Sequence, residues 1–247
     1  MAIREKNLDN PIIVALDGMT VDDALAMSTK LGDSVWGFKA NDLLDRKDGL
    51  TLLIQTGANF GLFADPKFHD IPNTVRNRVG NLISTLYHNI DFLTVHASGG
   101  VPMMRAAVEA VEFIGCGTNI LAVTVLTSLG EDQCNLTFGA PVKAKVLQFA
   151  RNALVARAHG IVCSGKELEF LAGFPELDNL IKVVAGIRFA KGDEHDQARV
   201  MTPGKAIKLG ADYLVIGRTI TNADDPVAAA QRALDEVKTA REEMTET

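Results

Sequence analysis

Eight short apolar runs recur along the chain, each followed by a stretch with helical spacing, and this alternation constrains the fold more than any other feature. Most runs are continuous Val, Ile, Leu or Phe, which is typical of parallel strands covered on both faces. Segments such as 21–31 and 142–158 place apolar residues three and four positions apart, as amphipathic helices do. The predicted strands are residues 11–17, 34–40, 59–67, 91–97, 119–127, 160–164, 181–187 and 213–218.

Eight strand–helix units in 247 residues predict an α/β fold, a (β/α)8 TIM barrel, as a single domain spanning residues 1–247. A doubly wound open sheet is the alternative, but it would gather its polar residues at one switch point. No Gly-x-Gly-x-x-Gly follows the first run, so a dinucleotide site has no support. The last segment, 226–243, is expected to be a helix that frays after about Lys238.

Composition excludes several classes of partner. The net charge of −6 and the absence of a basic stripe argue against nucleic acid. No stretch approaches the roughly 18 apolar residues of a membrane span, and the first ten residues lack the apolar core of a signal peptide. Cys116, Cys134 and Cys163 have neither disulfide nor metal spacing, so we expect thiols in a reducing cytoplasm.

Charged residues end the first three predicted strands. Barrel active sites lie at the C-terminal rim of the strands. The first predicted strand ends with Asp17, the second with Lys39, and the third with Asp65 and Lys67, with Asp70 just beyond. Asp65 and Lys67 are two residues apart and should leave a strand on the same face. Such a cluster gains little stability at a surface and is costly to bury, so we predict a functional role.

Glycine and arginine follow the last two predicted strands, on the opposite side of the barrel mouth. In barrels the loops after strands seven and eight commonly hold a phosphate. Gly217 permits close approach of a backbone N–H, and Arg188 and Arg218 supply forked donors. The alternative is that these arginines pair with surface carboxylates. The long polar segment 188–201 is expected to form a lid, from which Gln197 could reach over a ligand.

Three further polar residues follow strands four and five. Thr127 and Ser128 have no paired base in the sequence, so we expect them to hydrogen-bond a ligand rather than act as nucleophiles. His96 is either catalytic or a hydrogen-bonded histidine of the rim. The carboxylates of Asp65 and Asp70 could ligate magnesium, but two lysines in the same cluster would repel a dication, so no metal is expected.

The stretch Asp65-Pro-Lys-x-x-Asp70-Ile-Pro-Asn-Thr74 resembles the signature of the orotidine 5′-monophosphate decarboxylases. Sister families share the Asp-x-Lys-x-x-Asp part, whereas the Ile-Pro-Asn-Thr tail is highly specific. The resemblance extends along the chain to residues 14–17, 38–39, 95–100, 123–128, 186–188, 197 and 216–218.

The resemblance implies cofactor-free conversion of orotidine monophosphate to uridine monophosphate and CO2, the last step of de novo uridine monophosphate synthesis. It implies a homodimer in which the partner subunit supplies residues to each site. Lys67 would donate a proton to C6 of the pyrimidine. The implied roles are ribose contacts for Asp17 and Lys39, a charged tetrad of Lys39, Asp65, Lys67 and Asp70, supply from the partner for Asp70 and Thr74, pyrimidine reading for Ser128, and phosphate contacts for Arg188, Gln197, Gly217 and Arg218.

The chain departs from the family pattern at three places. Pro66 stands where Leu is usual, Ala-Asn-Asp follows Lys39, and Val-Ala precedes Gly186. None of these removes a named catalytic group, but Pro66 lacks an N–H and is expected to delete a ladder hydrogen bond in the third strand. The alternatives in function are a magnesium-dependent decarboxylase or aldolase of sugar phosphates, and a non-catalytic sensor of phosphorylated ligands.

Overall fold

Eight parallel strands pair in chain order and close into a barrel, with Val14 of the first strand opposite Ile216 of the last. The computed structural model describes residues 9–46, 60–86, 89–190 and 201–246. This topology confirms the predicted (β/α)8 TIM barrel and shows that the open-sheet alternative is wrong. The strands are β1 Ile12–Ala15, β2 Gly37–Ala40, β3 Gly61–Phe68, β4 Phe92–His96, β5 Asn119–Val123, β6 Gly160–Ser164, β7 Ile181–Ala185 and β8 Tyr213–Ile216.

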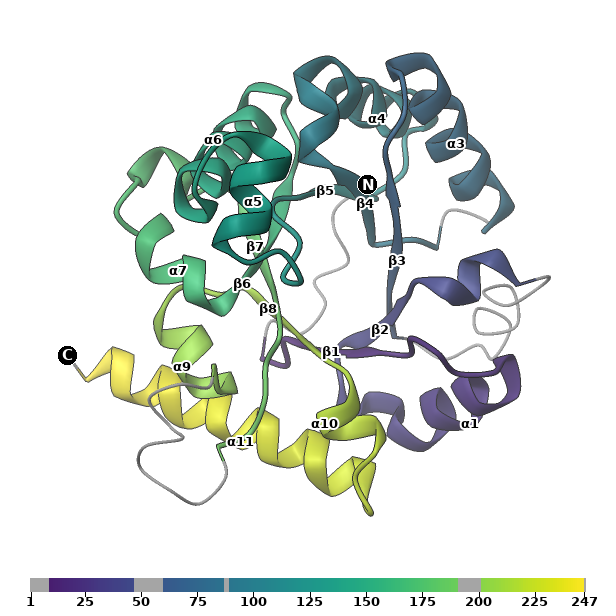
Figure 1. Ribbon diagram of the computed structural model, residues 1–247. Helices are drawn as coiled ribbons and strands as arrows, with labels where there is room; N and C mark the ends of the chain where they lie inside the picture. Colours follow the sequence, from purple (N-terminus) through teal and green to yellow (C-terminus); the bar gives the residue numbers. More distant parts are fainter. Residues whose placement is uncertain (1–8, 47–59, 87–88, 191–200, 247) are drawn as a thin grey trace.

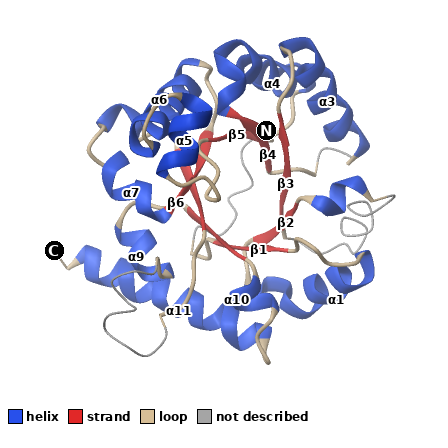
Figure 2. Ribbon diagram, in the orientation of Figure 1, coloured by secondary structure: helices blue, strands red, loops and turns tan. Residues whose placement is uncertain are grey.

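Helices surround the barrel as an outer ring, and the strands enclose the centre (Figures 1 and 2). The C-terminal helix runs along the outside of the barrel against α9. The helices contribute buried residues to the core that they share with the strands, which covers the outer face of the sheet. The helices are α1 Val21–Leu31, α3 Pro72–Thr85, α4 Gly100–Ile114, α5 Glu131–Phe138, α6 Val142–Val155, α7 Gly165–Leu171, α9 Pro203–Lys208, α10 Arg218–Thr221 and α11 Pro226–Thr245.

Aromatic side chains fill the interior of the barrel. The rings of Trp36, Phe92 and Tyr213 lie with their centroids 5.0 to 5.1 Å apart, and Phe63 joins Phe92 edge to face. The Trp36 ring has room because its neighbour is Gly61, where a Cβ would come within 2.4 Å of the ring. With this plug in the barrel, space for a ligand is left at the C-terminal mouth.

Several strands end earlier than the sequence pattern predicts. β5 stops at Val123 rather than at residue 127, because its pairing with β6 ends at Val162 and a turn closed by a hydrogen bond from Leu129 to Leu126 follows. β7 stops at Ala185, because Gly186 adopts a φ of +81° that no regular strand has. The prediction for residues 160–164 matches β6, and β1 and β8 each end two residues before the predicted boundary.

Two helix ends also differ from the prediction, while α1 has the predicted bounds. α6 ends at Val155 rather than at residue 158, because Arg157 adopts a left-handed φ of +64°. The expected fraying of α11 after Lys238 is wrong, since the helix continues to Thr245. Its buried face extends to Ala240, and Glu243 forms an ion pair with Lys208 of α9.

Candidate active site

Two lysines and two aspartates from three neighbouring strands meet at the mouth of the barrel. The Nζ of Lys67 lies 2.6 Å from Oδ2 of Asp65, and the Nζ of Lys39 lies 3.0 Å from the same oxygen. Lys39 also reaches Asp17, at 2.7 Å from Oδ1 and 2.9 Å from Oδ2. The structure therefore brings together Asp17, Lys39, Asp65 and Lys67 in one connected ionic network.

Burial differs across this network. The side chains of Asp65 and Lys39 are only 6% and 9% exposed, whereas that of Lys67 is 30% exposed and that of Asp17 is 51% exposed. Burial alone would lower the pKa of Lys39, but the carboxylates of Asp65 and Asp17 outweigh it and raise that pKa above its usual value. Lys39 is thus protonated at neutral pH, and Lys67 is the lysine that remains open to the mouth.

The backbone of β3 is irregular where these residues emerge. The four steps from Ala64 to Phe68 face only the two steps from Leu93 to Val95 on β4, so β3 carries a bulge. Within it Lys67 adopts a φ of +46°, a conformation that costs a non-glycine residue about 1–2 kcal/mol. Asp65 and Lys67 therefore meet through a bulge and not through regular strand alternation.

Asp70 and Thr74 lie beyond the end of β3 and stay outside this ionic network. Asp70 is exposed, and its Oδ1 accepts the N–H of Ile71 at 2.7 Å. Among the residues that the structure describes, Asp70 has no ion-pair partner. Thr74 is partly exposed in the first turn of α3. A tetrad that includes Asp70 is thus not formed within one chain, and its supply by a partner subunit stays a prediction.

Arg188 and Arg218 follow the adjacent strands β7 and β8, which pair through Ala185 and Val215. Both arginines are exposed, and neither guanidinium has a carboxylate partner within the described ranges. Gly217 caps the short helix α10, and Arg218 is its first residue. The backbone N–H of Arg188 donates to the carbonyl of Met201, which ties together the two ends of the segment between them. Gln197 lies outside the described residues, as does most of the predicted lid.

Thr127 and Ser128 lie in an exposed turn after β5 rather than at its end. The turn is closed by a hydrogen bond from the N–H of Leu129 to the carbonyl of Leu126. Their predicted place at the strand end is wrong because β5 ends four residues before Thr127. Their predicted contact with a ligand stays a prediction.

His96, the last residue of β4, lies beside His69, with ring centroids 5.5 Å apart. Burial lowers the pKa of His96, and the nearby His69 and Lys67 lower it further. The ring is therefore neutral at physiological pH. A neutral imidazole next to Lys67 leaves that lysine as the principal cation on this side of the mouth.

The profile of the orotidine 5′-phosphate decarboxylase / HUMPS family matches residues 10–233, nearly the whole chain. The chain belongs to this family. It is 42% identical over 232 residues to an orotidine 5′-phosphate decarboxylase of Rhodopseudomonas palustris, covering 93% of this chain and 95% of the relative. It is 40% identical over 225 residues to the enzyme of the same name from Chromohalobacter salexigens, covering 90% and 94%.

A solved structure of an orotidine 5′-phosphate decarboxylase also matches this chain over nearly its whole length. The crystal structure of orotidine 5′-phosphate decarboxylase from Lactobacillus acidophilus matches with a TM-score of 0.76 and 33% sequence identity. The match covers 92% of this chain and 99% of the other. The fold therefore agrees with membership of this family along nearly the whole length of the chain.

Two residues at one departure from the family pattern, Asn41 and Asp42, contact the backbone next to the charged cluster. The side-chain Nδ2 of Asn41 donates to the backbone carbonyl of Asp65 at 2.6 Å, just beyond the last paired residues of β2 and β3. Asp42 accepts the N–H of Gly18, next to Asp17. Pro66 lies in the bulge, where neither neighbouring strand continues its paired register. The lost N–H therefore removes no ladder bond, and the prediction that it would is wrong.

Two residues that support this family's charged cluster, Thr94 and Asn41, have no role in the sequence-based prediction. Thr94 is fully buried, and its hydroxyl contacts both the carboxylate of Asp65 and the backbone of Lys67. The sequence did contain a signal for Thr94, because this residue stands two positions before His96 and so faces the same side of the strand as His96. The signal for Asn41 is weaker, because its role depends on where β2 and β3 stop pairing.

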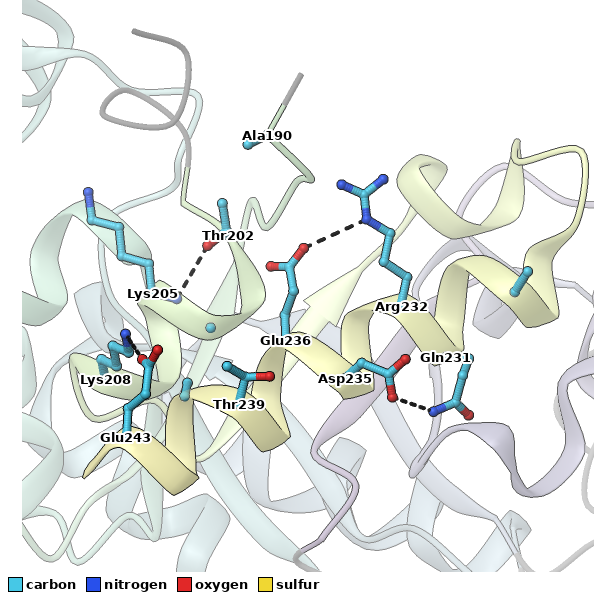
Figure 3. A pocket seen from close by; sticks show the side chains of 13 residues that line it. Ala190, Thr202, Lys205, Lys208, Gln231, Arg232, Asp235, Glu236, Thr239 and Glu243 are labelled. Carbon is cyan, nitrogen blue, oxygen red and sulfur yellow. Dashed lines mark hydrogen bonds and ion pairs between the residues drawn. The ribbon is translucent and has the colours of Figure 1, made fainter. Parts of the chain in front are cut away.

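An open groove of about 1010 Å³ lies away from the mouth, between α9 and α11 on the outer surface (Figure 3). Its charges are largely paired with one another, Lys208 with Glu243 and Arg232 with Glu236. It contains none of the residues of the ionic network at the mouth. The groove is therefore not the site at which the decarboxylase signature can act.

The described part of the chain offers neither a metal cluster nor a membrane-spanning helix. No group of three or more His, Cys, Asp or Glu side chains there is arranged to hold a metal ion. Within the same residues, no helix is both long and apolar enough to cross a membrane.

Proposed function

We propose that this chain decarboxylates orotidine 5′-monophosphate to uridine 5′-monophosphate and CO2 without a cofactor. The observation that carries the proposal is the contact of Lys67 with Asp65 at the barrel mouth, in a chain that belongs to the decarboxylase family. The two decarboxylases named above match this chain over most of their own length and support the same activity.

The chemistry requires a cation at the reacting carbon. Loss of CO2 from C6 of the pyrimidine leaves a carbanion with poor delocalisation, so the protein has to stabilise it electrostatically. In the proposal, Lys67 faces that carbon and then donates a proton to it. Asp65, 2.6 Å from Lys67, would lie near the departing carboxylate and hold the lysine in place.

The rest of the nucleotide would extend from this end of the mouth to the other. Asp17 and Lys39 would hydrogen-bond the ribose hydroxyls, and Thr127 and Ser128 would contact the base. The phosphate would lie near the ends of β7 and β8, where exposed arginines follow adjacent strands. Its contacts would come from Arg188, Gln197, Gly217 and Arg218.

We also propose that two subunits share each site. Among the described residues, Asp70 has no ion pair with the lysines of its own chain, and the neighbouring Ile71 is 66% exposed. An apolar residue exposed beside an unpaired carboxylate fits a surface that a second copy covers. Asp70 and Thr74 would then enter the partner's site and complete the tetrad there.

The reaction is proposed to occur in the cytoplasm. All three cysteines, Cys116, Cys134 and Cys163, are free thiols. Burial raises the pKa of Cys134 and of Cys163, which makes both thiols unreactive. Such thiols suit a reducing compartment.

The test is the ultraviolet absorbance change that accompanies loss of the carboxylate from orotidine monophosphate, recorded with and without EDTA. The proposal predicts turnover that EDTA does not alter. Turnover abolished by EDTA would instead favour a magnesium-dependent member of the superfamily, and no turnover of the nucleotide would contradict the proposal.

A further inference from the structure

The hydroxyl of Thr94 joins the two residues that form the reactive end of the site. It donates to Oδ1 of Asp65 at 2.8 Å and accepts the backbone N–H of Lys67 at 2.9 Å. An ionised carboxylate only accepts hydrogen bonds, so the single hydroxyl proton points to Asp65 and the lone pair to Lys67. Thr94 is completely buried, so no water competes for either bond.

The two oxygens of Asp65 are thereby given separate partners. Oδ2 accepts from Lys67 at 2.6 Å and from Lys39 at 3.0 Å, while Oδ1 accepts from Thr94. Rotation about the terminal bond of an aspartate is broad and roughly two-fold when nothing opposes it. The bond to Thr94 opposes it here and keeps Oδ2 turned towards both lysines.

The same hydroxyl also supports the bulge in β3. Lys67 has a φ of +46°, and its N–H lies where β3 and β4 are out of register. A residue in this conformation persists only where its surroundings hold it. The Thr94 hydroxyl supplies the hydrogen bond that the regular ladder does not, and so sets the direction in which the Lys67 side chain leaves the strand.

We propose that Thr94 is a positioning residue for decarboxylation, acting through Asp65 and Lys67 without touching the substrate. This inference rests on the proposed function. Displacing a catalytic group by about 1 Å can lower a rate by about 100-fold, so a residue that fixes both members of an ion pair affects the chemical step. Nucleotide binding, which depends on groups further along the mouth, should be affected little.

The test compares Thr94→Val, Thr94→Ser and Thr118→Val by steady-state decarboxylation kinetics. Thr118 is the matched control, since it is also buried and its hydroxyl donates to the carbonyl of Ile90 at 2.8 Å, away from the mouth. We expect Thr94→Val to lower kcat by about 10- to 100-fold with KM changed by less than about three-fold. Thr94→Ser, which keeps the hydroxyl, should stay within about three-fold of the wild type, as should Thr118→Val.

Several results would overturn the inference. They are a wild-type kcat in Thr94→Val, an equal fall in Thr94→Ser, or an equal fall in Thr118→Val. If Thr94→Val does not fold, the pair Thr94→Ala and Thr118→Ala repeats the comparison with smaller side chains.

A crystal structure of Thr94→Val tests the geometry independently of any activity measurement. We expect the Asp65 carboxylate to rotate or Lys67 to leave its positive φ, and retention of both would reject the positioning role. Absence of turnover in the wild type would instead reject the proposed function and leave this structural test standing.

Discussion

The two sides of the barrel mouth are built differently. On the side of β1 to β4, Asp17, Lys39, Asp65 and Lys67 are joined by short contacts. On the side of β7 and β8, Arg188 and Arg218 are exposed, and within the described residues neither is held by a carboxylate. The charges on one side are paired with one another, whereas the other side presents exposed donors.

The difference corresponds to two kinds of task. Charges that stabilise a transition state act best when they need not reorganise during the reaction, which suits a buried and interlocked cluster. Groups that hold a remote phosphate can supply binding energy as they close around it, which suits exposed arginines. The predictions that follow change one side or the other, beginning with the largest expected effect.

Replacing Lys67 with alanine should abolish most of the activity. The change removes the cation at the reactive end and the proton donor together, so we expect kcat to fall by several powers of ten while the fold is kept. Lys205→Ala, in the outer groove, is the control and should have wild-type kinetics. Turnover near the wild-type rate in Lys67→Ala would exclude its role as proton donor.

Replacing Arg218 with alanine should weaken the other side of the mouth. A charge-assisted hydrogen bond to a phosphate is worth about 1.5–3 kcal/mol, so kcat/KM should fall by about 10- to 100-fold. Orotidine, which lacks the phosphate, should show almost no difference between Arg218→Ala and the wild type. An unchanged kcat/KM for the nucleotide would reject the phosphate contact, and Arg151→Ala serves as the control for loss of an exposed arginine.

Mixing two inactive variants tests whether sites are shared. If Asp70 enters the partner's site, a dimer of one Lys67→Ala and one Asp70→Ala subunit contains one intact site. Random reassembly of equal amounts should then restore about a quarter of the wild-type activity. Each variant is unfolded and refolded alone as the control. No recovery in a mixture that has demonstrably exchanged subunits would place Asp70 outside the shared site.

The smallest expected effect concerns acid stability at the other end of the barrel. Burial lowers the pKa of His159, and its Nδ1 accepts the N–H of Ile120 at 3.0 Å, which only an unprotonated nitrogen can do. Because the folded pKa is below the unfolded value of 6.5, the unfolded chain binds the proton first. Stability should therefore fall as pH drops below 6.5, until the folded state is also protonated.

Urea unfolding of the wild type and of His159→Asn measures this effect. Asparagine keeps an acceptor for Ile120 but does not titrate, so the variant should lose part of the pH dependence. His96 also has a lowered pKa and should contribute the remainder. Identical pH profiles for the wild type and the variant would contradict the assignment to His159.

The sequence was sufficient for the barrel and for the charged residues of its rim. Eight apolar runs set the topology, and Lys39, Asp65 and Lys67 stand at strand ends that any closed parallel barrel brings to one mouth. The bulge in β3 could not be predicted, because it depends on how β3 and β4 pair, which the residue pattern of neither strand alone shows. The contacts of Thr94 with Asp65 and Lys67 depend on the bulge, so the role of Thr94 could not be predicted either.

The misjudged end of α11 has its cause in tertiary contacts. α11 extends beyond Lys238 because Ala240 is buried and Glu243 meets a lysine of α9. Neither contact leaves a local pattern in the sequence, so propensity and charge alone gave the wrong boundary.

A crystal structure with uridine monophosphate bound would show whether the two sides of the mouth hold the two ends of one nucleotide. We expect the contacts of Lys67 and Lys39 with Asp65 to stay as they are, with C6 of the base facing Lys67. We expect Arg188 and Arg218 to lie within hydrogen-bond distance of the phosphate. A phosphate bound elsewhere, or a Lys67 that has left Asp65, would contradict this division of the mouth.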